Sequence, residues 1–209
     1  MKDTKHEIVQ TATQLFNRDG FRNVALKQIA AELDISTGNL NYHFPKKDDL
    51  MPAVFEQMDA EAAEMLNKLR AYPDLKSIME QVSIFYEFQL KFRFFYLDTL
   101  EIIRAYPQIA AAHKEFSMRS MRHIRATIDY CVGRGVFRQE PFPRAYDFLA
   151  HSIWMHAAFW LAQFAVLQKD CTSQEIFVQS LLGLLHPYLT PAGLEELPIM
   201  GSPDFSKII

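Results

Sequence analysis

The chain is poor in glycine and in alternating sequence patterns. Only 7 of its 209 residues are glycine, and apolar and polar residues rarely alternate over more than a few positions. Since sandwiches and barrels of β-strands need tight turns and half-buried strands, this scarcity argues against an all-β fold. The hydrophobic residues, 49% of the chain, instead recur at helical spacing over long segments. The sequence therefore predicts an all-α fold with a sizeable core.

Cysteine is equally scarce. Cys131 and Cys171 lack CxxC spacing, so the sequence predicts neither a zinc site nor a disulfide framework, and we expect both thiols to be reduced. The first residues, Met-Lys-Asp-Thr-Lys-His-Glu, lead into an amphipathic helix and contain no apolar secretion signal. These features predict a cytoplasmic protein.

No charge of either sign dominates. The chain has 22 Lys and Arg against 25 Asp and Glu, which gives a net charge of −3. Composition alone therefore does not indicate nucleic-acid binding. Any contact with phosphate has to come from helix N-termini and from the local placement of Lys27, Lys46 and Lys47.

Motifs of the common enzyme classes are missing. None of the 7 histidines follows a Glu at the spacing that a di-iron bundle needs, and His151 and His156 do not share a helical face. The chain has no Gly-x-Ser-x-Gly, P-loop or GxGxxG sequence. We therefore expect no catalytic residue, metal or cofactor, and a helical-bundle enzyme with an unrecognised site is the less favoured alternative.

Residues 148–168 contain no charged side chain, and about 20 apolar residues suffice to span a membrane. Polar residues such as His151, His156 and Gln163 interrupt this stretch, and no Lys/Arg cluster flanks it. A helix that is apolar on nearly all sides is equally typical of burial on two sides. We therefore expect no membrane contact and a homodimer whose interface comprises residues of the predicted helices 145–168 and 174–185: Phe148, Phe159, Trp160, Phe164, Phe177, Leu181 and Leu185.

Aromatic residues are dense between residues 85 and 96. One interpretation is ordinary core, and the other is a cavity for an apolar or aromatic small molecule. In the second interpretation, Arg104, His113 and Tyr86 orient a polar end of the ligand. The candidate pocket residues are Phe85, Tyr86, Phe88, Phe92, Tyr96, Arg104 and His113.

The stretch 26–50, LKQIAAELDISTGNLNYHFPKKDDL, predicts two short helices joined by a tight turn. Asp34 tolerates the left-handed conformation that the turn needs, and Ser36 is suited to cap the second helix. Leu40 and Phe44, four residues apart, form the buried side of that helix. Thr37, Asn39, Asn41 and His43 then point outward, as in a helix that enters the major groove of DNA.

Residues 8–50 resemble the N-terminal domain of the TetR family of bacterial transcriptional regulators. The most specific match is the string Tyr-His-Phe at 42–44 followed by Lys47 and Leu50. The chain departs from the usual family pattern at Ala25, Asp34 and Asn41. Other matching residues are Ile8, Val9, Ala12, Leu15, Phe16, Gly20, Phe21, Ile29, Ala30, Ile35, Ser36, Gly38 and Leu40.

The resemblance implies a helix-turn-helix DNA-binding domain over residues 1–46 and a helical ligand-binding and dimerisation domain over 47–190. We expect an irregular tail over 191–209. The implied function is regulation of transcription by a homodimer that binds a palindromic double-stranded DNA operator. The implied regulator is a repressor that a small-molecule inducer releases from the operator, and activation of transcription is the other possibility for a regulator. A lipid-binding or carrier protein is the alternative from another functional class. The implied DNA contacts are Lys27, Thr37, Gly38, Asn39, Asn41, Tyr42, His43 and Lys47.

Overall fold

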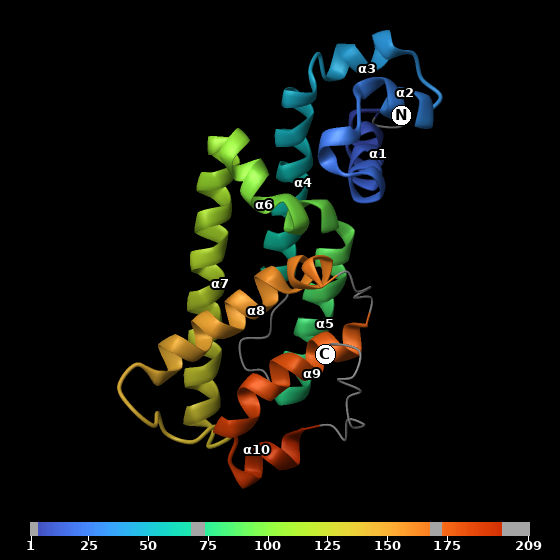
Figure 1. The fold of residues 1–209 in the computed structure, drawn as a ribbon. Helices are drawn as coiled ribbons and strands as arrows, with labels where there is room; N and C mark the ends of the chain where they lie inside the picture. The colour runs from blue at the N-terminus through green and yellow to red at the C-terminus, as the bar shows by residue number, and fades with distance from the viewer. Residues whose placement is uncertain (1–3, 68–73, 168–172, 198–209) are drawn as a thin grey trace. The chain divides into compact units, whose positions relative to one another are not determined.

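The computed structural model describes residues 4–67, 74–167 and 173–197, and every regular element within these ranges is helical (Figure 1). This confirms the predicted all-α fold. The helices are α1 (Thr4–Asp19), η1 (Phe21–Asn23), α2 (Leu26–Glu32), α3 (Thr37–His43), α4 (Lys47–Asn67), α5 (Leu75–Lys91), α6 (Arg93–Ala105), α7 (Pro107–Gly133), α8 (Ala145–Val166), α9 (Gln174–Leu185), η2 (His186–Tyr188) and α10 (Pro191–Glu196).

The chain forms two compact units. The first contains the described part of Met1–Lys68 together with Phe88–Ala111, and the second contains the described parts of Leu69–Glu87 and Ala112–Ile209. The first unit therefore combines helices α1 to α4 with α6. In the described ranges, no helix has the length and hydropathy of a membrane span.

Aromatic rings fill the core of the first unit. Phe16 of α1 packs edge-on against Phe21 of η1 and against Phe94 of α6, with both ring centroids 5.3 Å away. Phe55 of α4 lies 5.6 Å from Phe95 of α6. Because these rings come from α1, η1, α4 and α6, burial of their apolar surface holds the helix-turn-helix segment on the longer helices.

The second unit has its own core, to which α5, α7, α8 and α9 contribute. Leu75, Met79, Ile128, Tyr146 and Val178 are among its buried members. Cys131 also lies in this core, and burial raises the pKa of its thiol to about 11. The thiol is therefore protonated at neutral pH. Cys171 lies outside the described residues.

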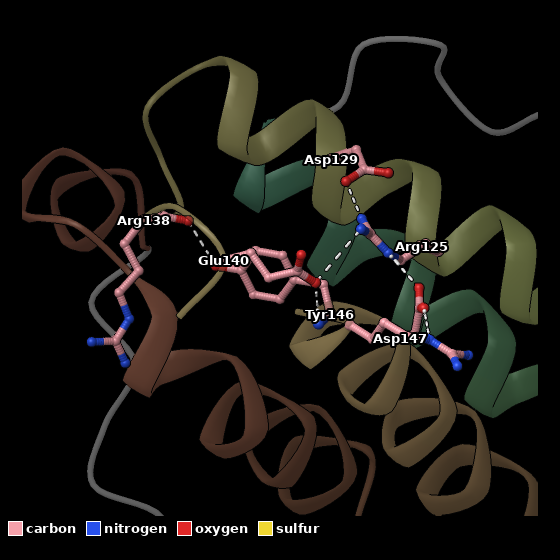
Figure 2. Close-up of polar contacts among 7 residues, drawn as sticks. Arg125, Asp129, Arg138, Glu140, Tyr146 and Asp147 are labelled. Carbon is pink, nitrogen blue, oxygen red and sulfur yellow. Dashed lines mark hydrogen bonds and ion pairs between the residues drawn. The ribbon is translucent and has the colours of Figure 1, made fainter. Parts of the chain in front are cut away.

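Ion pairs join α7 to the start of α8 in the second unit (Figure 2). Arg125 of α7 donates to Asp147 at 2.9 Å and also pairs with Asp129 one turn along its own helix. Glu140, in the loop between the two helices, accepts a 2.9 Å hydrogen bond from the backbone amide of Tyr146. The Tyr146 hydroxyl donates to the carbonyl of Arg138 at 2.7 Å. These contacts fix where α8 begins relative to α7.

The expectation of an irregular tail from residue 191 is wrong for its first six residues, because Pro191–Glu196 form helix α10. Thr190 caps this helix by accepting a 3.2 Å hydrogen bond from the amide of Gly193. A Cβ at Gly193 would lie 2.3 Å from the Val136 carbonyl oxygen, so glycine permits a close approach to the loop after α7. Residues 198–209 lie outside the described part of the chain.

Candidate nucleic-acid interface

The turn between α2 and α3 has the geometry that the sequence predicts. Asp34 adopts a left-handed backbone with φ of 53°. The next amide, that of Ile35, donates to the carbonyl of Ala30 at 3.0 Å and closes the turn. Ser36 then caps α3, because its hydroxyl accepts a 3.1 Å hydrogen bond from the amide of Asn39. The turn therefore fixes the angle at which α3 leaves α2.

Helix α3 has one buried and one exposed side. Leu40 and Phe44 are buried, with exposed fractions of 0% and 3%. His43 is half-buried, and the ring of Tyr42, which is 84% exposed, stands edge-on to it at 5.2 Å. The remaining predicted contacts on this helix are exposed: Thr37, Gly38, Asn39 and Asn41. A short helix with small and amide side chains on its free face has the shape and chemistry for a major groove.

Helix α2 begins without a hydroxyl cap. Ala25 occupies the cap position, and the side chain of Gln28 accepts a 2.6 Å hydrogen bond from its amide. Gln28 therefore satisfies one of the donors at this helix end, although it does not replace a capping side chain. Lys27, in the first turn of α2, is exposed.

The basic side chains of this segment differ in how they are neutralised. Arg18 pairs with Asp19 at 3.0 Å and with Glu32 of α2 at 3.7 Å. Lys27 and Lys46 are exposed, and in the structure as described neither has an ion pair. The charges of Lys27 and Lys46 thus remain available to a phosphate backbone.

Lys47 differs from its neighbour Lys46. Its ammonium donates to the carbonyl of Phe21 and, at 3.2 Å, to the carbonyl of Arg22. It also lies 4.4 Å from the centroid of the Phe21 ring and 5.7 Å from that of Phe16. Burial lowers the pKa of this ammonium, while Asp48 and Glu101 oppose that change. The side chain expected at a phosphate is thus directed into the protein.

Four polar contacts that the sequence does not predict join this segment to the end of α5, to α6 and to the residue after α6. Asn17 accepts a 2.9 Å hydrogen bond from the amide of Phe94 and donates at 2.8 Å to the carbonyl of Lys91. Two side-chain contacts complete the set, namely an ion pair between Arg22 and Glu101 and a 2.9 Å hydrogen bond from Tyr106 to Asp48. No motif marks these residues, because their partners lie 58 to 79 positions away along the chain.

The candidate pocket residues divide between the two compact units. In the first unit, Phe88 and Phe92 pack on each other at 5.2 Å, Tyr96 is buried and Arg104 is exposed. In the second unit, Tyr86 packs on Phe177 at 5.2 Å, and Phe85 is half-buried. His113, also in the second unit, stacks on Phe116, and burial lowers the pKa of its imidazole.

The predicted interface residues also fall into two groups. Phe148 and Phe159 of α8 are 64% and 44% exposed in the single chain. The other residues expected at the interface are buried inside the second unit: Trp160, Phe164, Phe177, Leu181 and Leu185. They pack on one another, with the Trp160 ring 4.7 Å from Phe164 and 5.3 Å from Phe177. These buried residues support the exposed side of α8 from within.

Known proteins match this chain over most of its length. Residues 8–54 match bacterial regulatory proteins of the tetR family, and residues 53–197 match a family described as bacterial transcriptional repressor. The HTH-type transcriptional regulator HbdR of Aromatoleum sp. (strain CIB) is 23% identical over 208 residues, covering 92% of this chain and 84% of HbdR.

Solved structures of regulators share the fold. A TetR-family transcriptional regulator from Marinobacter aquaeolei VT8 has a TM-score of 0.82 and 25% identity, over 93% of this chain and 95% of its own. A putative transcriptional regulator from Saccharomonospora viridis, solved in complex with choline, has a TM-score of 0.72 and 23% identity, over 91% of this chain and 100% of its own. Such proteins are transcriptional regulators and not enzymes. Since the two family matches run from residue 8 to residue 197, the chain belongs to the TetR family of bacterial transcriptional regulators and carries its helix-turn-helix DNA-binding domain.

Proposed function

We propose that the protein is a homodimeric repressor, which binds a palindromic operator in the cytoplasm and leaves it when a small-molecule inducer binds. The observation that carries this proposal is the two-sided helix α3, where Leu40 and Phe44 are buried while Asn39 and Asn41 are exposed. Burial of Leu40 and Phe44 holds α3 in place, so the side-chain amides of Asn39 and Asn41 have fixed positions on its exposed side. Recognition of base edges by hydrogen bonds requires such fixed positions.

Asn39 and Asn41 are the proposed base contacts, because an Asn amide both donates and accepts and so pairs with two positions on adenine. Thr37 lies beside them at the start of α3. Gly38 supports a close approach to DNA. A Cβ there would meet only the Ser36 hydroxyl, at 3.8 Å, so the fold itself does not require glycine at this position.

Contacts with the phosphate backbone are proposed for the exposed or half-buried side chains at the edge of α3 and on α2. Tyr42 and His43 end the exposed side of α3, and Lys27 projects from α2. Lys46 offers a further exposed charge directly before α4. These contacts would position the protein on DNA without specifying sequence.

Dimerisation is proposed through the exposed stripe of α8, which consists of Phe148, Met155, Phe159 and Val166. Their exposed fractions are 64%, 46%, 44% and 81%. Their separations of 7, 4 and 7 residues place them on one side of the helix. Covering this stripe with the same stripe of a second copy gives a two-fold interface. Two α3 helices can then meet successive major grooves, about 34–36 Å apart.

The proposed inducer is an apolar or aromatic small molecule bound in the C-terminal domain. In the second unit, the aromatic side chains of Phe85 and Tyr86 supply the apolar surface that such a ligand prefers. Release requires that the ligand favour a different position of α4, which begins at Lys47 directly after the DNA-binding segment. The coupling free energy between two such sites is commonly about 1–3 kcal/mol.

Selection of bound sequences from randomised DNA tests the proposal. We expect the unmodified protein to recover one motif with two-fold symmetry, and the double variant Asn39→Ala/Asn41→Ala to recover none. Recovery of an asymmetric motif would exclude the two-fold operator. Recovery of the same motif by the double variant would exclude base reading by α3.

A further inference from the structure

We infer that the inducer is a neutral molecule with an apolar body and one acceptor oxygen, which is a carbonyl or hydroxyl oxygen, and that the indole N–H of Trp160 donates to this oxygen. The inference rests on the proposed function for the role of the ligand as an inducer. The chemistry of the site rests on contacts within the second compact unit, where helices α8 and α9 pack on each other.

Trp160 carries a buried polar group that the chain leaves without a partner. Its side chain is 2% exposed, and its indole N–H meets no acceptor among the residues that the structure describes. A buried donor without an acceptor costs about 1–3 kcal/mol, and the N–H of a buried tryptophan usually has a partner. The N–H of Trp160 therefore points to an acceptor that comes from outside the chain.

The rings that surround Trp160 are mainly apolar. It packs on Phe164, one turn further along α8, at 4.7 Å and on Phe177 of α9 at 5.3 Å. The half-buried His156, one turn earlier on α8, lies 5.0 Å away, and these four residues form the Trp160 cluster. A buried water molecule needs about two to four polar partners, and phenylalanine rings supply none. An organic molecule can satisfy the N–H with one oxygen and place its apolar body against the rings.

His156 is the polar neighbour of Trp160, and its nitrogen Nε2 is already engaged. The Ser180 hydroxyl donates its single proton to the carbonyl of Phe177 at 2.7 Å, so it accepts from Nε2 of His156, also at 2.7 Å. Burial lowers the pKa of this imidazole below its usual 6.5, so the ring is neutral at neutral pH. The cluster therefore has no histidine cation that could pair with an anionic ligand.

No lysine or arginine compensates for this within the described part of the second unit. No ion pair or cation–π contact there involves Trp160, Phe164 or Phe177. Moving a carboxylate from water into such surroundings without a partner costs far more than moving a carbonyl or a hydroxyl. The cluster therefore favours a neutral oxygen acceptor over a carboxylate.

NMR of the indole N–H groups tests the inference on the unmodified protein. The chain has only two tryptophans, and the half-buried Trp154 is the internal control. Acetone and cyclohexanone are the neutral probes, because each offers one carbonyl oxygen. We expect both to move the Trp160 resonance downfield and to leave that of Trp154 in place. Cyclohexane, which lacks the oxygen, and cyclohexanecarboxylate, which is charged, should produce no downfield shift.

A Trp160 resonance that neither ketone moves would overturn the inference, and a larger downfield shift with cyclohexanecarboxylate would overturn the choice of a neutral ligand. Trp160→Phe supplies a second measurement, because it keeps an aromatic ring and removes the N–H. The dissociation constant of cyclohexanone should rise about five-fold in this variant, as for one lost hydrogen bond, and stay unchanged in Trp154→Phe. Equal dissociation constants in the two variants would also overturn the inference.

These measurements contain no DNA, so they separate the inference from the proposed function. Failure of the protein to select any operator from randomised DNA would refute the proposed function and leave the shifts with both ketones as expected. Selection of a two-fold operator together with an unmoved Trp160 resonance would refute the inference alone.

Discussion

Asn17 supplies the sharpest test of how the DNA-binding segment is attached to α6. Helix α5 ends at Lys91 and α6 begins at Arg93, and Phe92, at the cap position of α6, provides no side-chain cap. The Asn17 amide serves both helix ends from 74 and 77 residues away, because it donates to the Lys91 carbonyl and accepts from the Phe94 amide. One side chain of α1 therefore performs two capping functions.

Asn17→Ala removes both hydrogen bonds. A side-chain hydrogen bond contributes about 1 kcal/mol net, and loss of a helix cap costs about 0.5–2 kcal/mol, so the free energy of unfolding should fall by about 2 kcal/mol. Asn17→Asp keeps the oxygen that accepts from Phe94 and loses the donor to Lys91, and we expect it to lose about half as much.

Urea unfolding at a fixed protein concentration measures these differences, because the stability of a dimer depends on concentration. Asn23→Ala is the control, since Asn23 donates one exposed hydrogen bond to the Asp19 carbonyl at 2.8 Å. We expect the control to lose about 0.5 kcal/mol. Equal unfolding midpoints for Asn17→Ala and Asn23→Ala would refute the double capping role.

The remaining predictions concern base reading, assembly and pH. Asn39→Ala and Asn41→Ala should each weaken operator binding by about 1–3 kcal/mol at unchanged Tm, and wild-type operator affinity in both would remove them from the base contacts. Phe159→Asp should leave the protomer folded, because this side chain is 44% exposed, and should weaken dimerisation by about 3–5 kcal/mol; a stable dimer in sedimentation would contradict this. Burial lowers the pKa of His156 below its usual 6.5, so unfolding takes up a proton and the free energy of unfolding should fall as pH drops below about 6.5. His156→Gln should reduce this pH dependence, and equal pH profiles of Tm would count against it.

Local patterns predicted the helix-turn-helix segment well. The left-handed turn at Asp34, the cap at Ser36 and the buried pair Leu40 and Phe44 each follow from the residue and its near neighbours. The bounds of the helix Gln174–Leu185 were predicted for the same reason. In these places the residues that decide the structure lie within one or two helical turns of each other.

Contacts between distant residues could not be predicted in this way. Lys47 is exposed or internal depending on where the Phe21 carbonyl lies, 26 residues earlier, and no local pattern encodes that distance. Helix α8 poses a different problem. It is apolar on nearly all sides, so the sequence does not show that Trp160 faces inward while Phe148 and Phe159 face solvent. Packing against α9 fixes the rotation of α8 about its axis.

Half-site spacing in the selected operator tests the central claim most directly, because the account requires two α3 helices held at one separation. Inserting five base pairs, about half a turn of DNA, between the half-sites places them on opposite faces of the duplex. We expect affinity for this DNA to fall to the level of random DNA. Inserting about ten base pairs should restore part of the affinity only if the dimer can stretch. Unchanged affinity after the five-base-pair insertion would contradict a rigid two-fold dimer as the DNA-binding form.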